Sequence, residues 1–299
     1  MTKLTHLTCL PDLLILAPKI TNKSLMFTLN CNGRLLVVDN PVVMGIINIT
    51  PDSFYAGSRF TGERDILQQA EKMLQEGALI LDIGGQSTRP GSEQISIEEE
   101  LKRVIPVIEQ LHARFPEAIL SIDTYQSKVA ASAVAAGALL VNDISAGNID
   151  NQMLSTVASL HVPYICMHMK GTPATMQQNP AYENVTREVL DFFIQKIEQC
   201  HTAGIPDIII DPGFGFGKTM QHNFELLKNL RAFSILNKPL LLGVSRKSTI
   251  SKTLGITTAE ALNGTTVLNT VGLMNGATIL RVHDVKEAKE AVTLVGKLR

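Results

Sequence analysis

The sequence predicts an α/β protein in which eight parallel strands alternate with helices and close into a (β/α)8 barrel, the TIM barrel. Eight short apolar runs recur at even spacing from Val42 onward, and amphipathic stretches separate them. The roughly 260 residues that hold this pattern match the about 250 residues typical of such barrels. A doubly wound open sheet also alternates strands with helices and is the alternative prediction.

The apolar runs have the composition of strands that are buried on both faces. They are rich in Leu and β-branched residues and occupy residues 42–49, 79–84, 119–124, 139–145, 163–169, 207–213, 239–245 and 277–284. Amphipathic patterns predict helices over residues 62–77, 96–115 and 183–204. Three glycines stand where helix C-caps are expected, namely Gly77, Gly137 and Gly204.

The residues before Val42 fall outside the repeat. The dipeptide Asn32-Gly33 favours a tight turn between two strands, so residues 25–40 are predicted to form a hairpin that closes the bottom of the barrel. Residues 1–24 are predicted to form an N-terminal tail. The predicted domain, 25–299, therefore contains both the hairpin and the barrel.

The composition excludes several classes of protein. The chain has 299 residues with 27 Lys and Arg against 28 Asp and Glu, a balance that argues against nucleic-acid binding. No apolar run approaches the about 18 residues of a membrane span. The first residues contain Pro11, Asp12 and Pro18 and do not resemble a signal peptide. We expect a reducing, cytoplasmic location, because the four cysteines show no paired spacing: Cys9, Cys31, Cys166 and Cys200.

Nearly every predicted strand ends on a polar residue. In (β/α)8 barrels the active site is built at these C-terminal strand ends. One such residue could simply cap the next helix. So many together indicate a polar opening at the C-terminal end of the barrel, the mouth, whose hydrogen-bonding groups a ligand would satisfy. Arg281 and His283 are two apart and share a face, although Arg281 could instead pair with a carboxylate such as Asp82. The polar strand ends are Asn48, Asp82, Asp123, Asn142, Asp143, His168, Asp211, Ser245, Arg281 and His283.

Three loops follow predicted strands and have unusual compositions. Residues 48–54 and 84–93 combine Gly, Ser and Pro with Phe54 and Arg89, as loops that cover a site do. The third loop, DPGFGFGKT (211–219), has neither the spacing of a P-loop nor that of a dinucleotide fingerprint. It predicts a backbone that approaches a flat ligand, with Phe214 or Phe216 available for stacking.

Together these segments resemble the dihydropteroate synthase family. They cover nearly all of residues 44–285 in order: GIINITPDSF (45–54), LDIGGQSTRPG (81–91), SIDT (121–124), VNDIS (141–145), DPGFGFGK (211–218), GVSRKS (243–248) and RVHDV (281–285). The resemblance implies a transferase of folate biosynthesis that joins 6-hydroxymethyl-7,8-dihydropterin diphosphate to 4-aminobenzoate. It also implies release of diphosphate, use of Mg²⁺, competition by sulfonamides, and a homodimer.

The resemblance also implies the residues of three subsites. The pterin pocket comprises Asp123, Asn142, Asp211 and Lys247, with Met167 and Gly243 as apolar walls. The diphosphate site comprises Asn48, Thr88, Arg281 and His283, with Asn48 as the Mg²⁺ ligand. The aminobenzoate subsite comprises Phe54, Arg89, Pro90, Phe216 and Ser248. One position departs from the family, because Ala56 stands where the first loop commonly carries an acid; Asp52 is the nearest acid that could replace it.

These residue types suit the implied reaction. Carboxylates can accept from the N–H groups of a pterin edge, and an asparagine can both donate and accept. Cations and helix N-termini stabilise the charge that develops on a leaving diphosphate. No covalent nucleophile is required, because the aminobenzoate amine attacks the methylene carbon, and a dissociative, carbocation-like step is expected.

Two alternatives stay open from the sequence. A corrinoid-linked pterin methyltransferase would share the pterin pocket but would have no diphosphate to hold, and STRP (87–90) and RVHD (281–284) argue against it. A non-catalytic pterin-binding barrel is the second alternative, and Ala56 is the only residue that hints at it.

Overall fold

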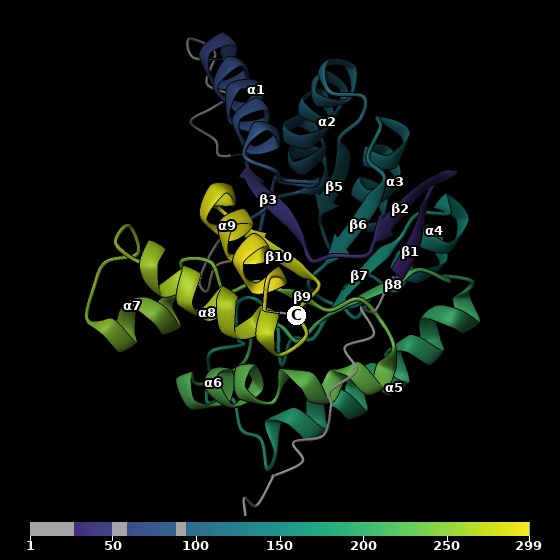
Figure 1. The fold of residues 1–299 in the computed structure, drawn as a ribbon. Coiled ribbons are helices and arrows are strands. Elements are labelled where there is room, and N and C mark those ends of the chain that lie inside the picture. The colour runs from purple at the N-terminus through teal and green to yellow at the C-terminus, as the bar shows by residue number, and fades with distance from the viewer. Residues whose placement is uncertain (1–26, 50–58, 88–93, 299) are drawn as a thin grey trace, which may run out of the picture.

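A computed structural model describes residues 27–49, 59–87 and 94–298 of the chain, and its centre is a parallel sheet. The strands lie in the order β8-β7-β6-β5-β4-β3-β10-β9, and a parallel bridge between Ile210 and Leu240 joins the two ends (Figure 1). The sheet therefore closes as the predicted (β/α)8 barrel, and the open-sheet alternative is wrong. The strands are β3 (Val42–Asn48), β4 (Ile80–Gly84), β5 (Ile119–Asp123), β6 (Leu140–Asp143), β7 (Tyr164–Met167), β8 (Ile208–Asp211), β9 (Leu241–Leu242) and β10 (Ile279–Val282).

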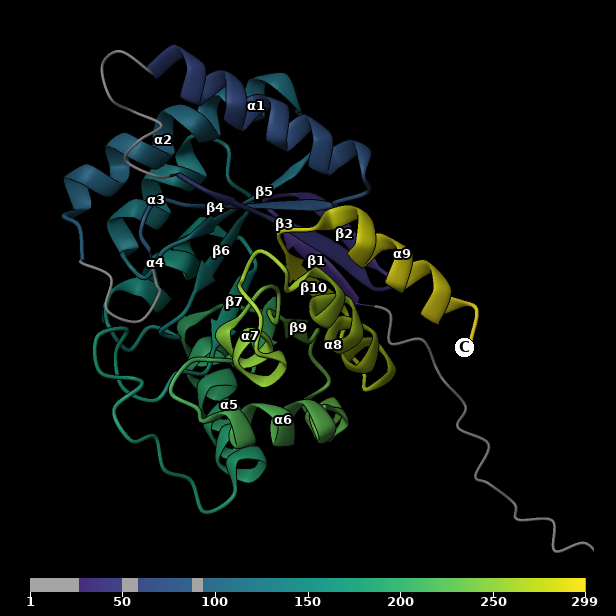
Figure 2. The ribbon, with the colours of Figure 1, turned by 90° about the vertical axis from the view of Figure 1, so that its left-hand side faces the viewer.

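Helices surround the strands, with α1 and α2 on one side and α5 and α6 on the opposite side (Figure 2). The helices predicted at 62–77, 96–115 and 183–204 are confirmed as α1, α2 and α5. Within the described ranges no helix is long and apolar enough to cross a membrane. The helices are α1 (Arg59–Gln75), α2 (Ile97–Arg114), α3 (Ser127–Ala135), α4 (Met153–Leu160), α5 (Val185–Ala203), α6 (Met220–Lys228), the 3-10 helix η2 (Leu230–Leu236), α7 (Ser248–Leu254), α8 (Leu262–Met274) and α9 (Val285–Gly296).

The predicted hairpin is present and lies against the N-terminal end of the barrel. β1 (Phe27–Cys31) and β2 (Arg34–Val38) pair antiparallel, and the turn residues Asn32 and Gly33 both have positive φ, 53° and 88°. The inward side chains of the hairpin pack against one apolar residue from each barrel strand. This buried layer consists of Leu29, Cys31, Leu36 and Val38 with Met44, Ile80, Ile119, Leu140, Ile165, Ile209, Leu241 and Ile279. The predicted tail, 1–24, lies outside the described residues.

Along the barrel axis, the inward-facing side chains change from an apolar layer to a layer that includes charged and polar residues. Side chains two residues apart on a strand share a face, so the positions that follow the bottom layer also face the barrel interior. They begin the wall of the mouth and include Asp82, Asn142, Met167, Asp211, Gly243 and Arg281. The hairpin closes one end of the barrel, and the polar layer forms the other.

Candidate active site

Arg281 is the centre of a polar network at the C-terminal end of the barrel. Its Nε donates to Oδ2 of Asp82 at 2.6 Å, and its Nη2 donates to Oδ2 of Asp123 at 2.6 Å. Nδ2 of Asn142 donates to the same Asp82 oxygen at 3.0 Å. The predicted alternative for Arg281, pairing with Asp82, is thus confirmed as a contact. The network joins the ends of β10, β4, β5 and β6.

Two carboxylate oxygens of this network have no partner among the residues that the structure describes. Oδ1 of Asp82 and Oδ1 of Asp123 are buried and form no hydrogen bond with any described residue. A buried acceptor without a donor costs about 1–3 kcal/mol. Burial raises the pKa of Asp123 above its ordinary value, against the opposing effect of Arg281. The mouth therefore presents acceptors that N–H groups of a ligand would satisfy.

Asp211 and its neighbours form the opposite wall. Oδ1 of Asp211 accepts from the backbone N–H of Gly213 at 2.8 Å. Its Oδ2 lies 3.9 Å from the position that a Cβ on Gly243 would occupy. Burial raises the pKa of Asp211, and Lys247 opposes that shift. Met167 is buried in a small apolar cluster against which Phe216 packs.

Lys247 and Phe216 lie together at the edge of the mouth. The Lys247 Nζ is 4.5 Å from the centroid of the Phe216 ring and donates to the carbonyl of Phe214. Burial lowers the pKa of Lys247 to about 8. Phe214 is itself in the hydrophobic core, with 3% of its surface exposed, so the prediction that it could stack on a ligand is wrong. Ser248 is exposed and begins α7 directly after Lys247.

The glycines of the 211–219 loop have a different role from the predicted one. A Cβ on Gly213, where φ is +69°, would come within 1.9 Å of the carbonyl oxygen of His168. A Cβ on Gly217, where φ is +63°, would come within 2.4 Å of the carbonyl oxygen of Lys170. These two glycines let the loop pack against the chain that follows β7. The structure therefore explains them by contact within the protein rather than by approach to a ligand.

Asn48 and His283 lie at the ends of the neighbouring strands β3 and β10. Asn48 is exposed, and its Oδ1 is 3.6 Å from the position of a Cβ on Gly84. Oδ2 of Asp123 is 3.7 Å from that same position, so the missing side chain of Gly84 leaves room between two oxygens. Nδ1 of His283 bonds Oγ of Ser245 at 3.0 Å, which fixes the imidazole beside the start of α9.

Two predicted polar strand ends do not face the mouth. His168 packs edge-on against Phe192 of α5, and burial lowers its pKa to about 2. Its imidazole is therefore neutral, and Nδ1 is 2.8 Å from Nζ of Lys218. Asp143 accepts from Ser145 and Tyr164, which satisfies it within the protein.

Four predicted site residues lie outside the described residues: Phe54, Thr88, Arg89 and Pro90. Asp52 and Ala56 of the first loop lie outside them as well. Two residues that the subsite predictions omitted are Asp82 and Lys218. The sequence predicts Asp82 as a polar strand end of the mouth and as a possible partner of Arg281, but the resemblance assigns it to no subsite. For Lys218 the only sequence signal is its place at the end of the glycine-rich loop.

Comparison with known proteins agrees with this geometry. Residues 44–283 match the family described as pterin binding enzyme. The dihydropteroate synthase of Escherichia coli (strain K12) is 44% identical over 265 residues, which cover 88% of this chain and 93% of the relative. A solved Yersinia pestis dihydropteroate synthase in a sulfonamide drug complex has a TM-score of 0.85 and 41% identity, covering 91% of this chain and 99% of that one. The Xanthomonas albilineans enzyme in complex with 7,8-dihydropteroate has a TM-score of 0.80 and 37% identity, covering 91% and 98%.

The barrel, its polar mouth and the family match define a pterin-binding enzyme. A sequence identity of 44% with the dihydropteroate synthase of Escherichia coli, over most of both chains, identifies the family within this class. The chain belongs to the dihydropteroate synthase family.

Proposed function

We propose that this chain condenses 6-hydroxymethyl-7,8-dihydropterin diphosphate with 4-aminobenzoate to form 7,8-dihydropteroate and diphosphate. The observation that carries the proposal is the set of buried acceptors in the mouth, above all the Oδ1 atoms of Asp82 and Asp123, which have no partner in the described part of the chain. A pterin edge carries amide and amine N–H groups that match such acceptors. The related Yersinia pestis and Xanthomonas albilineans enzymes have been solved with a sulfonamide drug and with 7,8-dihydropteroate, which supports the same choice of ligands.

The pterin is proposed to bind between Asp123, Asn142 and Asp211. Since a carboxylate only accepts, the contact with Asp82 requires Nδ2 of Asn142 to point toward it. Oδ1 of Asn142 is then the atom offered to a ligand donor. Oδ2 of Asp211 lies beside Gly243, where no side chain intervenes. These acceptors hold the ring while Met167 supplies an apolar wall and Lys247 a donor.

The reaction exchanges one bond at the exocyclic methylene carbon. The bond from that carbon to the diphosphate oxygen breaks, the electron pair leaves with diphosphate, and the aminobenzoate nitrogen forms the new bond and loses a proton. We expect the carbon to become carbocation-like before attack, since the electron-rich dihydropterin ring can stabilise it. His283 stands beside the N-terminus of α9, where a developing anion is favoured, and Arg281 precedes it by two residues on β10. Phe216 and Ser248 are proposed to receive the aminobenzoate.

Mg²⁺ is proposed as the cofactor, with Asn48 as its protein ligand. The space that Gly84 leaves beside Oδ1 of Asn48 fits a cation that takes one protein oxygen and completes its shell with water and phosphate oxygens. The described residues contain no group of three or more His, Cys, Asp or Glu that could hold a metal by themselves. When bound, the ion neutralises charge on the leaving diphosphate.

A diphosphate-release assay tests the reaction. Diphosphate should appear only when both substrates are present, and chelation of Mg²⁺ should reduce the rate. Product formation must equal diphosphate release, which distinguishes condensation from simple hydrolysis. A protein that binds the pterin but releases no diphosphate with 4-aminobenzoate would be the non-catalytic alternative. Methyl transfer to a corrinoid would instead support the second alternative.

Sulfonamides are proposed to compete with 4-aminobenzoate at the subsite that contains Phe216 and Ser248. The related Yersinia pestis enzyme has been solved in a sulfonamide drug complex. Competitive inhibition against 4-aminobenzoate, with no competition against the pterin substrate, is the expected kinetic pattern.

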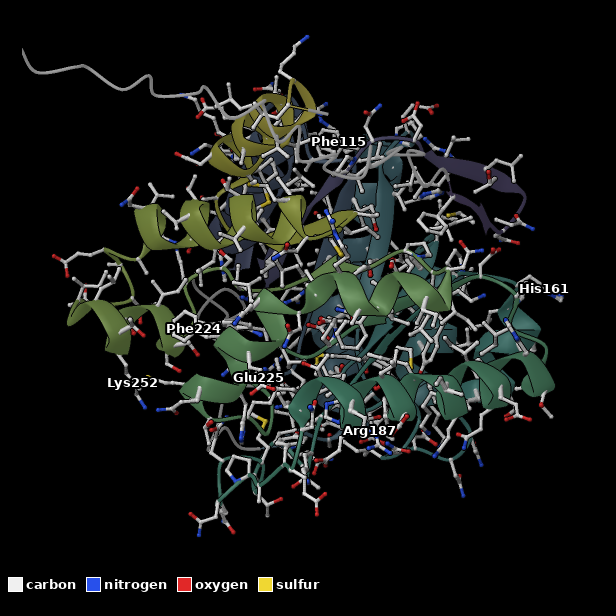
Figure 3. The ribbon with its side chains drawn as sticks, turned by 60° about the horizontal axis from the view of Figure 1, so that its bottom comes forward. Phe115, His161, Arg187, Phe224, Glu225 and Lys252 are labelled. Atoms are coloured by element: carbon white, nitrogen blue, oxygen red, sulfur yellow. The ribbon has the colours of Figure 1, made fainter. Side chains whose placement is uncertain are left out.

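The chain is also proposed to form a homodimer through α8. This helix exposes Val267, Val271 and Met274 at 52%, 37% and 56%, and their spacing places them on one face. α6 packs against α8 and carries the exposed Phe224, which is labelled in Figure 3. Light scattering should give twice the chain mass, and Val271→Asp should shift it toward the monomer.

A cytoplasmic location is proposed as well. Cys31, Cys166 and Cys200 are free and buried, as expected of a protein kept in a reducing compartment. Fractionation of cells that express the protein should recover it with cytoplasmic enzymes.

A further inference from the structure

The loop that carries Phe216 is held by an unusually complete set of side-chain donors. Five consecutive backbone carbonyls, from residue 213 to residue 217, each accept from a side chain. Gln177 Nε2 donates to the carbonyl of Gly215 at 2.8 Å, and the Tyr182 hydroxyl donates to that of Gly217 at 2.8 Å. Lys247 donates to the carbonyl of Phe214. Lys218 donates to the two others, those of residues 213 and 216, each at 3.0 Å.

Lys218 is the most deeply buried of these donors. Only 2% of its surface is exposed. Its Nζ also lies 2.8 Å from Nδ1 and 3.3 Å from the carbonyl oxygen of His168, just beyond β7. The lysine thus ties the loop to the barrel from the inner side, while Gln177 and Tyr182 hold it from the outer side.

The number of N–H donors on Nζ of Lys218 indicates that this residue does not bind substrate directly. An ammonium group has three N–H donors and no acceptor. Lys218 Nζ already faces four acceptors, all of them protein atoms: Nδ1 and the carbonyl of His168, and the carbonyls of Gly213 and Phe216. No donor is left for a ligand, so Lys218 is not itself a ligand-binding residue, and its hydrogen bonds serve the loop.

Phe216 is the part of the loop that reaches the site. Its carbonyl is bonded by Lys218, and its ring lies 4.5 Å from Nζ of Lys247 and joins the apolar cluster of Met167. We propose that Lys218 is a positioning residue for the aminobenzoate subsite, which it serves by fixing the backbone that presents Phe216. The proposal rests on the proposed placement of Phe216 in that subsite.

Lys218→Met tests the proposal, because methionine fills similar space without a donor. In the full-length enzyme we expect the KM for 4-aminobenzoate to rise about tenfold or more, as loss of the two hydrogen bonds to the loop carbonyls would give. The affinity for the pterin substrate should change less, because two of its proposed ligands, Asp123 and Asn142, lie on β5 and β6, and only Asp211 adjoins this loop. Tyr182→Phe is the matched control: it removes a donor from the Gly217 carbonyl but leaves the Phe216 carbonyl held. It should change the same KM by less than about threefold.

A double-mutant cycle with Phe216→Ala makes the test specific. If Lys218 acts through Phe216, the two effects on the KM for 4-aminobenzoate are strongly non-additive. Additive effects, an unchanged KM in a folded Lys218→Met enzyme, or equal losses for both substrates would each overturn the proposal. If Phe216→Ala alone leaves that KM unchanged, the subsite assignment fails instead.

A second variant covers the case in which Lys218→Met does not fold. Lys218→Gln keeps N–H donors that can serve only part of the loop contacts, and we expect a smaller rise in the same KM than full loss of the donors would give. An equal rise in the KM values of both substrates in folded Lys218→Gln would also overturn the proposal.

Discussion

Arg281 and Asp82 are in direct contact at 2.6 Å, although 199 positions separate them in the sequence. The same oxygen of Asp82 accepts from Asn142, and Arg281 also bonds Asp123. The proposed diphosphate ligand Arg281 and two of the proposed pterin ligands, Asp123 and Asn142, therefore belong to one hydrogen-bonded unit. Arg281 has two roles to test, one as a structural partner of buried carboxylates and one as an anion ligand.

Arg281→Ala should destabilise the free protein and weaken its response to diphosphate. Removing the guanidinium leaves Asp82 and Asp123 buried without their cation, which costs about 3–5 kcal/mol. Thermal melting with and without diphosphate measures both effects. Arg281→Lys keeps the charge but loses the planar fork that reaches both carboxylates, so it should recover only part of the stability. An unchanged melting temperature without ligand would show that the contacts contribute no stability, and intact stabilisation by diphosphate would exclude the anion role.

Asp211→Ala should weaken binding of the pterin substrate even when 4-aminobenzoate is absent. The substitution leaves a ligand donor without its acceptor, which costs about 1–3 kcal/mol, or roughly five- to a hundredfold in affinity. Calorimetric titration with the pterin measures the loss. Asp191→Ala removes an exposed carboxylate from α5 and serves as the control. Normal pterin affinity in Asp211→Ala would remove this residue from the proposed pocket.

Glu100→Gln should change how stability depends on pH. Glu100 is 2% exposed, its Oε1 has no partner among the described residues, and burial raises its pKa to about 7 from 4.5. The folded state holds this proton more tightly than the unfolded state. Protonated Glu100 therefore contributes to the free energy of unfolding. This contribution is fully present below about pH 4.5 and is lost as pH rises through about 7, with a magnitude on the order of 3 kcal/mol.

Chemical denaturation across that pH range measures the Glu100 effect. The glutamine variant cannot titrate, so its stability should fall less steeply with pH than that of the wild type. Glu109→Gln, an exposed change on the same helix, should retain the wild-type slope. Identical slopes for wild type and Glu100→Gln would contradict the assignment.

The lowered pKa of Lys247 predicts that the KM for 4-aminobenzoate depends on pH. Its pKa is lowered to about 8 by burial, and its ammonium lies over the Phe216 ring. As pH rises through about 8 the cation is lost, so the KM for the anionic 4-aminobenzoate should increase. Lys247→Arg keeps its charge at higher pH and should remove this increase, whatever its effect on the absolute KM. The same pH profile in both enzymes would assign the effect to another group.

The fold was predictable because its signals are local. Each buried strand is a short apolar run, each helix has its own amphipathic period, and Asn32-Gly33 favours positive φ at the hairpin turn. Alternation along a strand also extends to the site: Ile80 and Asp82 share a face, as do Ile279 and Arg281. Because active sites of such barrels lie at the C-terminal strand ends, the position of the polar mouth followed from the sequence.

Only the tertiary structure decided which polar strand ends meet. Arg281 faces Asp82 and Asp123 because barrel closure brings β10 beside β3, whereas His168 points toward α5 and bonds Lys218. Phe214 and Phe216 are also two apart, yet only Phe216 reaches the mouth. Positive φ at Gly213, Gly215 and Gly217 breaks the alternation that holds in a strand, so periodicity could not separate the two rings. Such long-range contacts and left-handed backbone leave no regular pattern in the sequence, and they determine how this site is assembled.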